Sequence, residues 1–98
     1  IAFTSGSPKV TVPTIGAVLS GSIVTFEWTA NGFPVSQWWL YVGSSQGGYN
    51  IYDSGSLGTQ LFETVTGLPV DGSTIFVRLW YRSAGTWQFA DSSYTAFN

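Results

Sequence analysis

The chain has 98 residues, enough for one domain with a modest hydrophobic core. It contains no cysteine and no histidine, so it lacks disulfide bonds and the commonest general base and zinc ligand near neutral pH. Three basic and five acidic residues give a net charge of −2. Nucleic-acid binding needs a basic stripe, which two arginines and one lysine do not supply, and no apolar run is long enough to span a membrane.

Serine, threonine, glycine, asparagine and glutamine supply most of the polar surface, while aromatic residues make up 17% of the chain. This balance is typical of secreted bacterial modules. Because the chain opens at Ile1 and contains no methionine, we expect it to be a piece of a longer precursor. No internal repeat or low-complexity linker divides residues 1–98, so we expect a single domain.

Glycine and proline recur about every ten residues, a spacing typical of an all-β sandwich or barrel, and no segment has helical periodicity. The first expected strand, 9–19, is an edge strand kinked at Pro13 and Gly16, because proline cannot donate a hydrogen bond to a sheet. The other expected strands are 22–30, 38–42, 49–53, 60–68, 73–82 and 86–91, with a loop at 54–58 and a hairpin tip at Ala84-Gly85. Seven or eight short strands in this order predict an all-β fold, a two-sheet antiparallel β-sandwich.

Alternation along the strand at 73–82 separates an aliphatic face from a face that carries arginines and aromatic rings. The aliphatic face contains Ile75, Val77 and Leu79, and the other face contains Phe76, Arg78, Trp80 and Arg82. Because burying two arginines is very costly, we expect the aliphatic face to line the core. Trp80 therefore faces outward.

The adjacent residues Trp38 and Trp39 point to opposite faces of their strand. Leu40 and Val42 share a face with Trp38 and carry it into the core, so Trp39 faces outward with Tyr41. In an immunoglobulin-like sandwich the third and sixth strands are neighbours, about 4.8 Å apart. Their outward side chains then form one exposed aromatic patch, and a patch of this kind marks a binding site.

The last expected strand, 86–91, borders the same patch. It contributes either Gln88 and Ala90 or Trp87 and Phe89, depending on its register. We favour Trp87.

Three stretches resemble a fibronectin type III-like or immunoglobulin-like module of bacterial secreted and surface proteins: SIVTFEWTA at 22–30, SQWWLYVG at 36–43 and TVTGLPVDGSTIFVRLW at 64–80. Trp28 stands where those modules place a core tryptophan on their second strand, and residues 64–72 resemble the turn before their sixth strand. Thr74 departs from the pattern, because fibronectin-type modules usually carry a tyrosine there. The resemblance implies an immunoglobulin/fibronectin type III-like scaffold and names no ligand.

Small size, low charge, absent cysteine and a face of tryptophans resemble a carbohydrate-binding module of a bacterial glucanase. Among those modules the chain most resembles family 81, which is attached to an endoglucanase. The resemblance implies a non-catalytic domain that binds polysaccharide or oligosaccharide. It implies β-glucan chains such as cellulose oligomers, mixed-linkage glucan or xyloglucan as ligands. It also implies a covalently linked glycoside hydrolase and a secreted, extracellular location.

Sugar rings suit such a patch, because pyranoses have apolar C–H faces that stack on aromatic rings and hydroxyl edges that accept or donate hydrogen bonds. The predicted carbohydrate-binding residues are Trp39, Tyr41, Arg78, Trp80, Trp87 and Gln88. We expect Trp39 and Trp80 to be the stacking platforms, flanked by the other two aromatic residues, with Arg78 and Gln88 bonding the hydroxyl edges. Alternatively, Arg78 lies across Trp80 in a cation–π contact.

Catalysis and cofactors are not expected. A glycosidase needs two carboxylates around one bond, whereas the only glutamates, Glu27 and Glu63, lie in expected strands. Calcium is an alternative for Asp53, Asp71 and Asp91, although aspartate is common at turns for other reasons. Two other classes stay open: a structural spacer whose aromatic residues pack on a neighbouring domain, and a protein-adhesion domain.

Overall fold

The computed structural model describes residues 7–98. The strands are β1 (Lys9–Val12), β2 (Val24–Thr29), β3 (Gln37–Gly43), β4 (Tyr52–Gly58), β5 (Phe62–Val65), β6 (Thr74–Ser83) and β7 (Thr86–Thr95). This part of the chain contains no helix that is long and apolar enough to cross a membrane.

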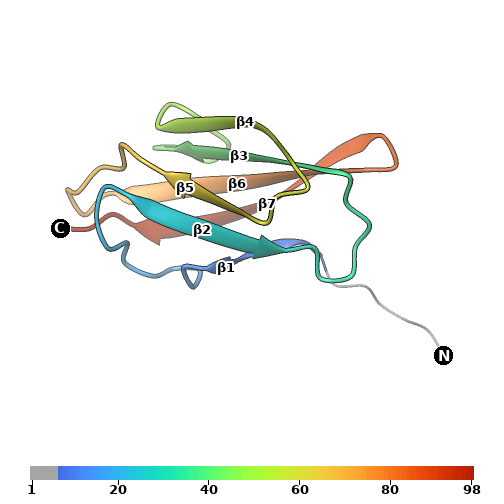
Figure 1. Cartoon of the computed structure of the whole chain (residues 1–98). Helices are drawn as coiled ribbons and strands as arrows, with labels where there is room; N and C mark the ends of the chain where they lie inside the picture. The colour runs from blue at the N-terminus through green and yellow to red at the C-terminus, as the bar shows by residue number, and fades with distance from the viewer. Residues whose placement is uncertain (1–6) are drawn as a thin grey trace.

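The strands form two antiparallel sheets that lie face to face as two layers (Figure 1). One sheet has the order β1-β2-β5, and the other has the order β4-β3-β6-β7. The predicted fold class, a two-sheet antiparallel β-sandwich, is confirmed, and the third and sixth strands are neighbours as expected. The hairpin of β6 and β7 reaches past the ends of the neighbouring strands at the right of Figure 1.

The core lies between the layers and contains the side chains that strand alternation assigns to it. Trp38, Leu40 and Val42 of β3 are buried, and β6 buries Ile75, Val77 and Leu79. Trp28 of β2 lies against Trp38 from the other sheet, with ring centres 6.0 Å apart. The predicted inward faces of these strands are therefore confirmed.

The N-terminal segment changes sheets at Pro13. β1 ends at Val12, and Pro13 has no N–H with which to continue the pairing. Beyond it, Gly16 N donates to Ser93 O at 3.0 Å and Leu19 N donates to Thr95 O at 2.8 Å, so this segment runs along β7 of the other sheet. The expected kink is confirmed, but the expected single strand over 9–19 is wrong.

The fourth strand lies later in the chain than expected. The sequence predicts a strand at 49–53 and a loop at 54–58, whereas β4 spans Tyr52–Gly58. Gly55 and Gly58 have positive φ angles of 70° and 57°, and the register with β3 shifts at two places. An edge strand accepts such irregularity because only one of its sides is paired. The glycines that suggested a loop belong to an irregular edge strand.

The hairpin between β6 and β7 has the predicted tip. Ala84 and Gly85 both have positive φ, at 50° and 78°, as a two-residue type I′ turn requires. Ser83 pairs with Thr86 on either side of the tip, and β7 continues to Thr95, beyond the expected end at 91. The turn therefore fixes the register of the two strands that carry most of the outer face.

A polar contact joins the two sheets near β4. Glu63 of β5 pairs in register with the buried Phe26, so its side chain points inward from an edge strand, a device that discourages pairing with another chain. Tyr52 Oη of β4 donates to Glu63 Oε2 at 2.6 Å. The hydrogen bond to this carboxylate raises the pKa of Tyr52 to about 12, with burial adding to the effect.

We expect Tyr52→Phe to remove a pH-dependent part of the stability. The pKa of Tyr52 is about 12 in the folded chain against the ordinary value of 10.0, so the folded state keeps a proton that the unfolded state releases between these values. The wild-type chain therefore loses stability as the pH rises from about 10 to about 12, and its advantage over Tyr52→Phe shrinks across that window. Urea unfolding at about pH 9 and about pH 11.5 measures the difference.

Tyr49→Phe is the matched control, because Tyr49 is 58% exposed. It shows what the loss of an exposed tyrosine hydroxyl alone does to the stability at each pH. A difference between wild type and Tyr52→Phe that stays constant over the interval would contradict the contact with Glu63.

Candidate functional site

The outer face of the four-stranded sheet carries a row of three aromatic side chains. The register places Trp39 of β3 opposite Trp80 of β6, and Trp80 opposite Phe89 of β7. Directly opposed side chains on one face of a sheet lie close enough to touch. The row therefore crosses three adjacent strands without interruption.

Polar and aromatic residues form the rows on either side. Towards the hairpin tip, Arg82 lies between Gln37 and Trp87, and in the other direction Arg78 lies between Tyr41 and Asp91. The first of these rows ends on a tryptophan and the second begins with a tyrosine. Each arginine is thus next to at least one aromatic ring on the same face.

The rings pack against one another edge to face. Trp39 and Trp87 have ring centres 6.2 Å apart at an interplanar angle of 87°, and Tyr41 and Trp80 have centres 5.8 Å apart at 78°. These four residues line an open groove with a volume of about 370 Å³. We call it the aromatic groove. Its walls come from three different strands.

Two indole N–H groups in the aromatic groove have different environments. Trp39 Nε1 donates to Asp53 Oδ1 of β4 at 2.7 Å, which holds the Trp39 ring against the edge strand. Trp80 Nε1 is buried and has no hydrogen-bond partner among residues 7–98. Leaving a buried donor unpaired costs about 1–3 kcal/mol. One of the residues that line the groove therefore carries a buried donor without a partner among residues 7–98.

Arg78 is paired with Asp91. Its Nε donates to Asp91 Oδ1 at 2.7 Å and its Nη2 donates to Asp91 Oδ2 at 2.8 Å, a bidentate contact between neighbouring strands. The hydrogen bonds raise the pKa of Arg78, and the same hydrogen bonds lower the pKa of Asp91. The side chains are only 19% and 22% exposed, so solvent reaches the pair poorly.

The loop after β3 folds onto this ion pair. Gln46 Nε2 donates to Asp91 Oδ2 at 2.9 Å. Gly47 has φ of 79° and lies so near Arg78 that a Cβ there would be 3.0 Å from the guanidinium carbon. The same carbon lies 3.7 Å from the centre of the Phe89 ring. Arg78 is therefore enclosed by the loop, a carboxylate and an aromatic ring.

Four of the six predicted site residues meet as expected. Trp39, Tyr41, Trp80 and Trp87 all line the aromatic groove, and the favoured register of the last strand, with Trp87 outward, is confirmed. Arg78 lies on the same face, but Asp91 and Phe89 occupy it; its guanidinium carbon is 5.5 Å from the Trp80 ring, in keeping with the alternative cation–π interpretation.

The inclusion of Gln88 on this face is wrong. Gln88 lies opposite Tyr81, which is buried on the inner side of β6. Neighbouring residues of a strand point to opposite faces, so an outward Trp87 and an outward Gln88 exclude each other. The prediction of both residues combined two registers of one strand.

Three residues of the site were not in the predicted set. Arg82 and Phe89 follow Trp80 and Trp87 by two positions, so the alternation that located the tryptophans also locates them. Tyr49 lies against Tyr41 with ring centres 4.8 Å apart. It belongs to a loop, where no periodicity indicates a direction.

The acidic residues near the face are held by separate partners. Asp53 accepts hydrogen bonds from Trp39 and from Gly55 N, while Asp91 is paired with Arg78. Asp71 accepts from the Ser73 hydroxyl and backbone N–H, which lower its pKa. Over residues 7–98, no three acidic side chains are grouped in a way that could hold a metal ion.

No protein-family model matches the chain, and no curated protein matches its sequence. Among solved structures, the chain is similar to an α-L-rhamnosidase from Dictyoglumus thermophilum, with a TM-score of 0.68 and 13% identity over 97% of this chain and 12% of that chain. It is also similar to a chitin-active lytic polysaccharide monooxygenase, with a TM-score of 0.50 and 16% identity over 85% of this chain and 59% of that chain.

Both neighbours are carbohydrate-active proteins. At these identities the similarity shows the fold, an all-β sandwich. The match spans about one eighth of the length of the rhamnosidase.

The unpaired Trp80 N–H predicts a contrast between two tryptophans. Trp80→Phe removes the unpaired donor and keeps an apolar ring, so we expect the free energy of unfolding to change by less than about 1 kcal/mol. Trp28 Nε1 donates to Gln60 O at 3.1 Å inside the core, so Trp28→Phe should cost more than about 2 kcal/mol. Denaturant unfolding of both variants measures the contrast. A cost for Trp80→Phe as large as that for Trp28→Phe would mean that the N–H has a partner in solution.

Proposed function

We propose that the domain is a non-catalytic carbohydrate-binding module that binds β-glucan chains in the aromatic groove. The observation that carries this proposal is the groove itself, whose four lining residues are Trp39, Tyr41, Trp80 and Trp87. Cellulose oligomers, mixed-linkage glucan and xyloglucan are the first ligands to test. Their β-linked rings carry equatorial substituents, so each ring presents apolar C–H faces to an aromatic wall.

The rings are arranged before any ligand arrives. The edge-to-face pairs of Trp39 with Trp87 and Tyr41 with Trp80 hold each ring in place, and Asp53 fixes the Trp39 indole. Aromatic side chains have few rotatable bonds, and ordering them beforehand lowers the entropy lost on binding. Stacking can therefore contribute to affinity with little reorganisation.

Hydroxyl edges of the glycan need donors that are not already used. Arg82 is exposed, borders Trp87 and makes no ion pair within residues 7–98. Arg78 lacks this freedom, because its Nε and Nη2 are bonded to Asp91. We therefore assign to Arg82 the polar role that the sequence suggested for Arg78 and Gln88.

The proposed role in the parent protein is to target an attached glycoside hydrolase to its substrate. The support is that the matched part of the rhamnosidase is 12% of that chain, the size of an accessory domain. A catalytic role is disfavoured, because a glycosidase needs two carboxylates around one bond, whereas Glu27 and Glu63 lie on the opposite sheet and Asp91 is held in a bidentate pair by Arg78. A secreted, bacterial location and the absence of a cofactor belong to the same proposal.

A structural spacer is the second candidate, and an observation on the opposite sheet favours it. Val12 and Phe62 flank Glu27 on the outer face of β1-β2-β5, and they are 45% and 54% exposed. Apolar side chains in this position suit contact with a neighbouring domain. This candidate predicts no response to sugars.

Tryptophan fluorescence titration with soluble polysaccharides distinguishes the two candidates. The panel is β-glucan, xyloglucan, xylan and mannan, together with cellohexaose. We expect saturable binding to the glucans and a loss of at least about tenfold in affinity for Trp39→Ala and for Trp80→Ala, because each removes a stacking surface. Thermal unfolding confirms that each variant is folded.

Phe62→Ala is the matched control, since it removes an exposed ring from the other sheet. Its affinity should equal that of the wild type. The absence of saturable binding across the whole panel would contradict the proposed function and favour the spacer.

Replacing Arg82 should change mainly the affinity for glucan, whereas replacing Arg78 should change mainly the stability of the fold. Arg82→Gln should lower glucan affinity by about threefold to tenfold and leave stability within about 0.5 kcal/mol, because an exposed side chain loses one contact with the ligand. Arg78→Gln should lower stability, since it leaves Asp91 without its bidentate partner. Calorimetric titration and denaturant unfolding of both variants test this. A larger loss of affinity for Arg78→Gln at unchanged stability would reverse the assignment.

A further inference from the structure

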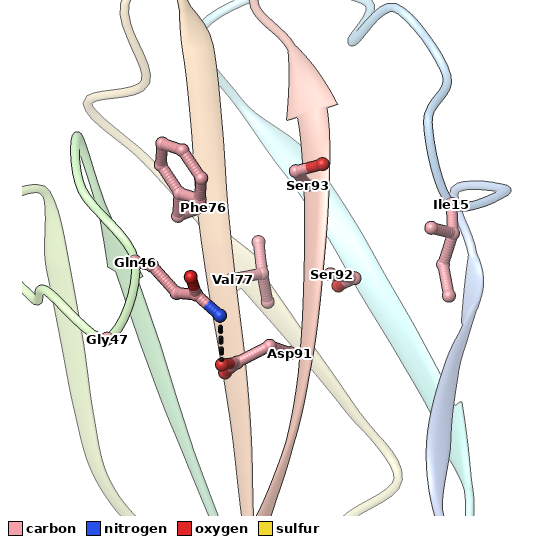
Figure 2. A pocket seen from close by; sticks show the side chains of 8 residues that line it. All are labelled: Ile15, Gln46, Gly47, Phe76, Val77, Asp91, Ser92 and Ser93. Carbon is pink, nitrogen blue, oxygen red and sulfur yellow. Dashed lines mark hydrogen bonds between the residues drawn. The ribbon is translucent and has the colours of Figure 1, made fainter.

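A second hollow lies on the same outer face, beyond the Arg78–Asp91 pair. Its volume is about 340 Å³, and its lining includes Gln46, Phe76, Asp91 and Ser93, with Ile15 beyond the edge of β7 (Figure 2). Phe76 and Ser93 are opposed in register, so both belong to the outward side of their strands. The hollow and the aromatic groove therefore lie on the same face of the sheet, with the Arg78–Asp91 pair and the loop at Gln46 and Gly47 between them.

The lining of the hollow combines the Phe76 ring and two aliphatic residues, Ile15 and Val77, with polar groups. Phe76 lies between Gly43 of β3 and Ser93 of β7, so no large side chain stands beside its ring on either neighbouring strand. The loop after β3 closes one side, because Gly48 packs directly on Gly43, where a Cβ would be 2.6 Å from Gly48 C. This arrangement leaves a space over Phe76.

Polar atoms surround that space. Figure 2 shows Gln46 reaching from its loop towards Asp91, where its Nε2 donates to the carboxylate. This contact leaves Gln46 Oε1 free to accept a hydrogen bond, and the exposed Ser93 hydroxyl stands across the hollow. An aromatic ring surrounded by hydroxyl, amide and carboxylate groups matches a sugar ring with its hydroxyl edge.

We propose that this hollow is a second subsite for the same glycan, so that one chain occupies the aromatic groove and the hollow together. The proposal rests on the proposed function of the groove. Four strand positions separate Trp80 from Phe76, about 13 Å along β6. A single sugar ring does not cover that length, so the ligand must contain several linked units. Because Asp91 and Arg78 balance each other's charge, the region between the groove and the hollow carries no net charge from this pair, which suits a neutral glycan chain.

Calorimetric titration of the 98-residue chain with a ladder of cello-oligosaccharides, from disaccharide to hexasaccharide, tests the proposal. We expect weak binding of the shortest members and an increase of about tenfold in affinity once the chain is long enough to reach Phe76, the gain that burial of one aromatic contact supplies. Phe76→Ala should abolish this increase and leave the affinity of short members within about twofold of wild type. Phe62→Ala, which removes an exposed ring from the opposite sheet, should change neither.

The outcomes separate this inference from the proposed function. Binding that needs Trp80 but gains nothing with chain length would overturn the second subsite and leave the groove intact. An equal loss for short and long members in Phe76→Ala would also overturn it, since Phe76 would then act through the fold. A failure of every member to bind would overturn the second subsite, and it would overturn the proposed function as well if the polysaccharide panel also showed no saturable binding.

Discussion

The antiparallel register between β3 and β6 sets what the exposed face contains, because it places Trp39 opposite Trp80 and Tyr41 opposite Arg78. The inner side of the same two strands holds that register in place. Leu40 and Leu79, which are fully buried, oppose each other across the pair. A slip of one residue in one strand would turn its aliphatic side chains outward and bury an arginine or a tryptophan with an unpaired N–H. Core packing thus selects the arrangement of the outer face.

The ion pair between Arg78 and Asp91 determines how charge is distributed on that face. A guanidinium beside an aromatic row would ordinarily attract anionic ligands, but here its charge is balanced by a bidentate carboxylate. Gln46 binds the same carboxylate and brings the loop after β3 down onto the sheet. The pair therefore acts mainly on structure, joining β6, β7 and the loop, while Arg82 remains exposed at the other end of the aromatic groove.

Strand alternation made the fold class, the inward faces and the four groove aromatics predictable, because each depends on neighbours one or two positions away. Strand alternation alone predicted that Trp38 faces the core and Trp39 faces outward. The errors come from information that lies elsewhere in the chain. The burial of Tyr81 fixes the face of its partner Gln88, and Asp91 determines whether Arg78 is available to a ligand. β4 was misplaced because its glycines are compatible with an irregular strand only at the edge of a sheet, a position that local sequence does not reveal.

An exposed aromatic surface on a domain with few charges is a liability for solubility, and the way the rings pack reduces it. Trp80 touches Tyr41 and Phe89 edge to face, and Trp87 packs on Trp39 in the same way, so each ring covers part of its neighbour. The same contacts restrict the motion of the rings, which lowers the entropy that a ligand must overcome. Packing that protects the isolated domain is therefore also the packing that orders the rings of the proposed binding site. The unpaired Trp80 N–H fits the proposed function, since the packing that fixes this ring leaves a donor that residues 7–98 do not satisfy.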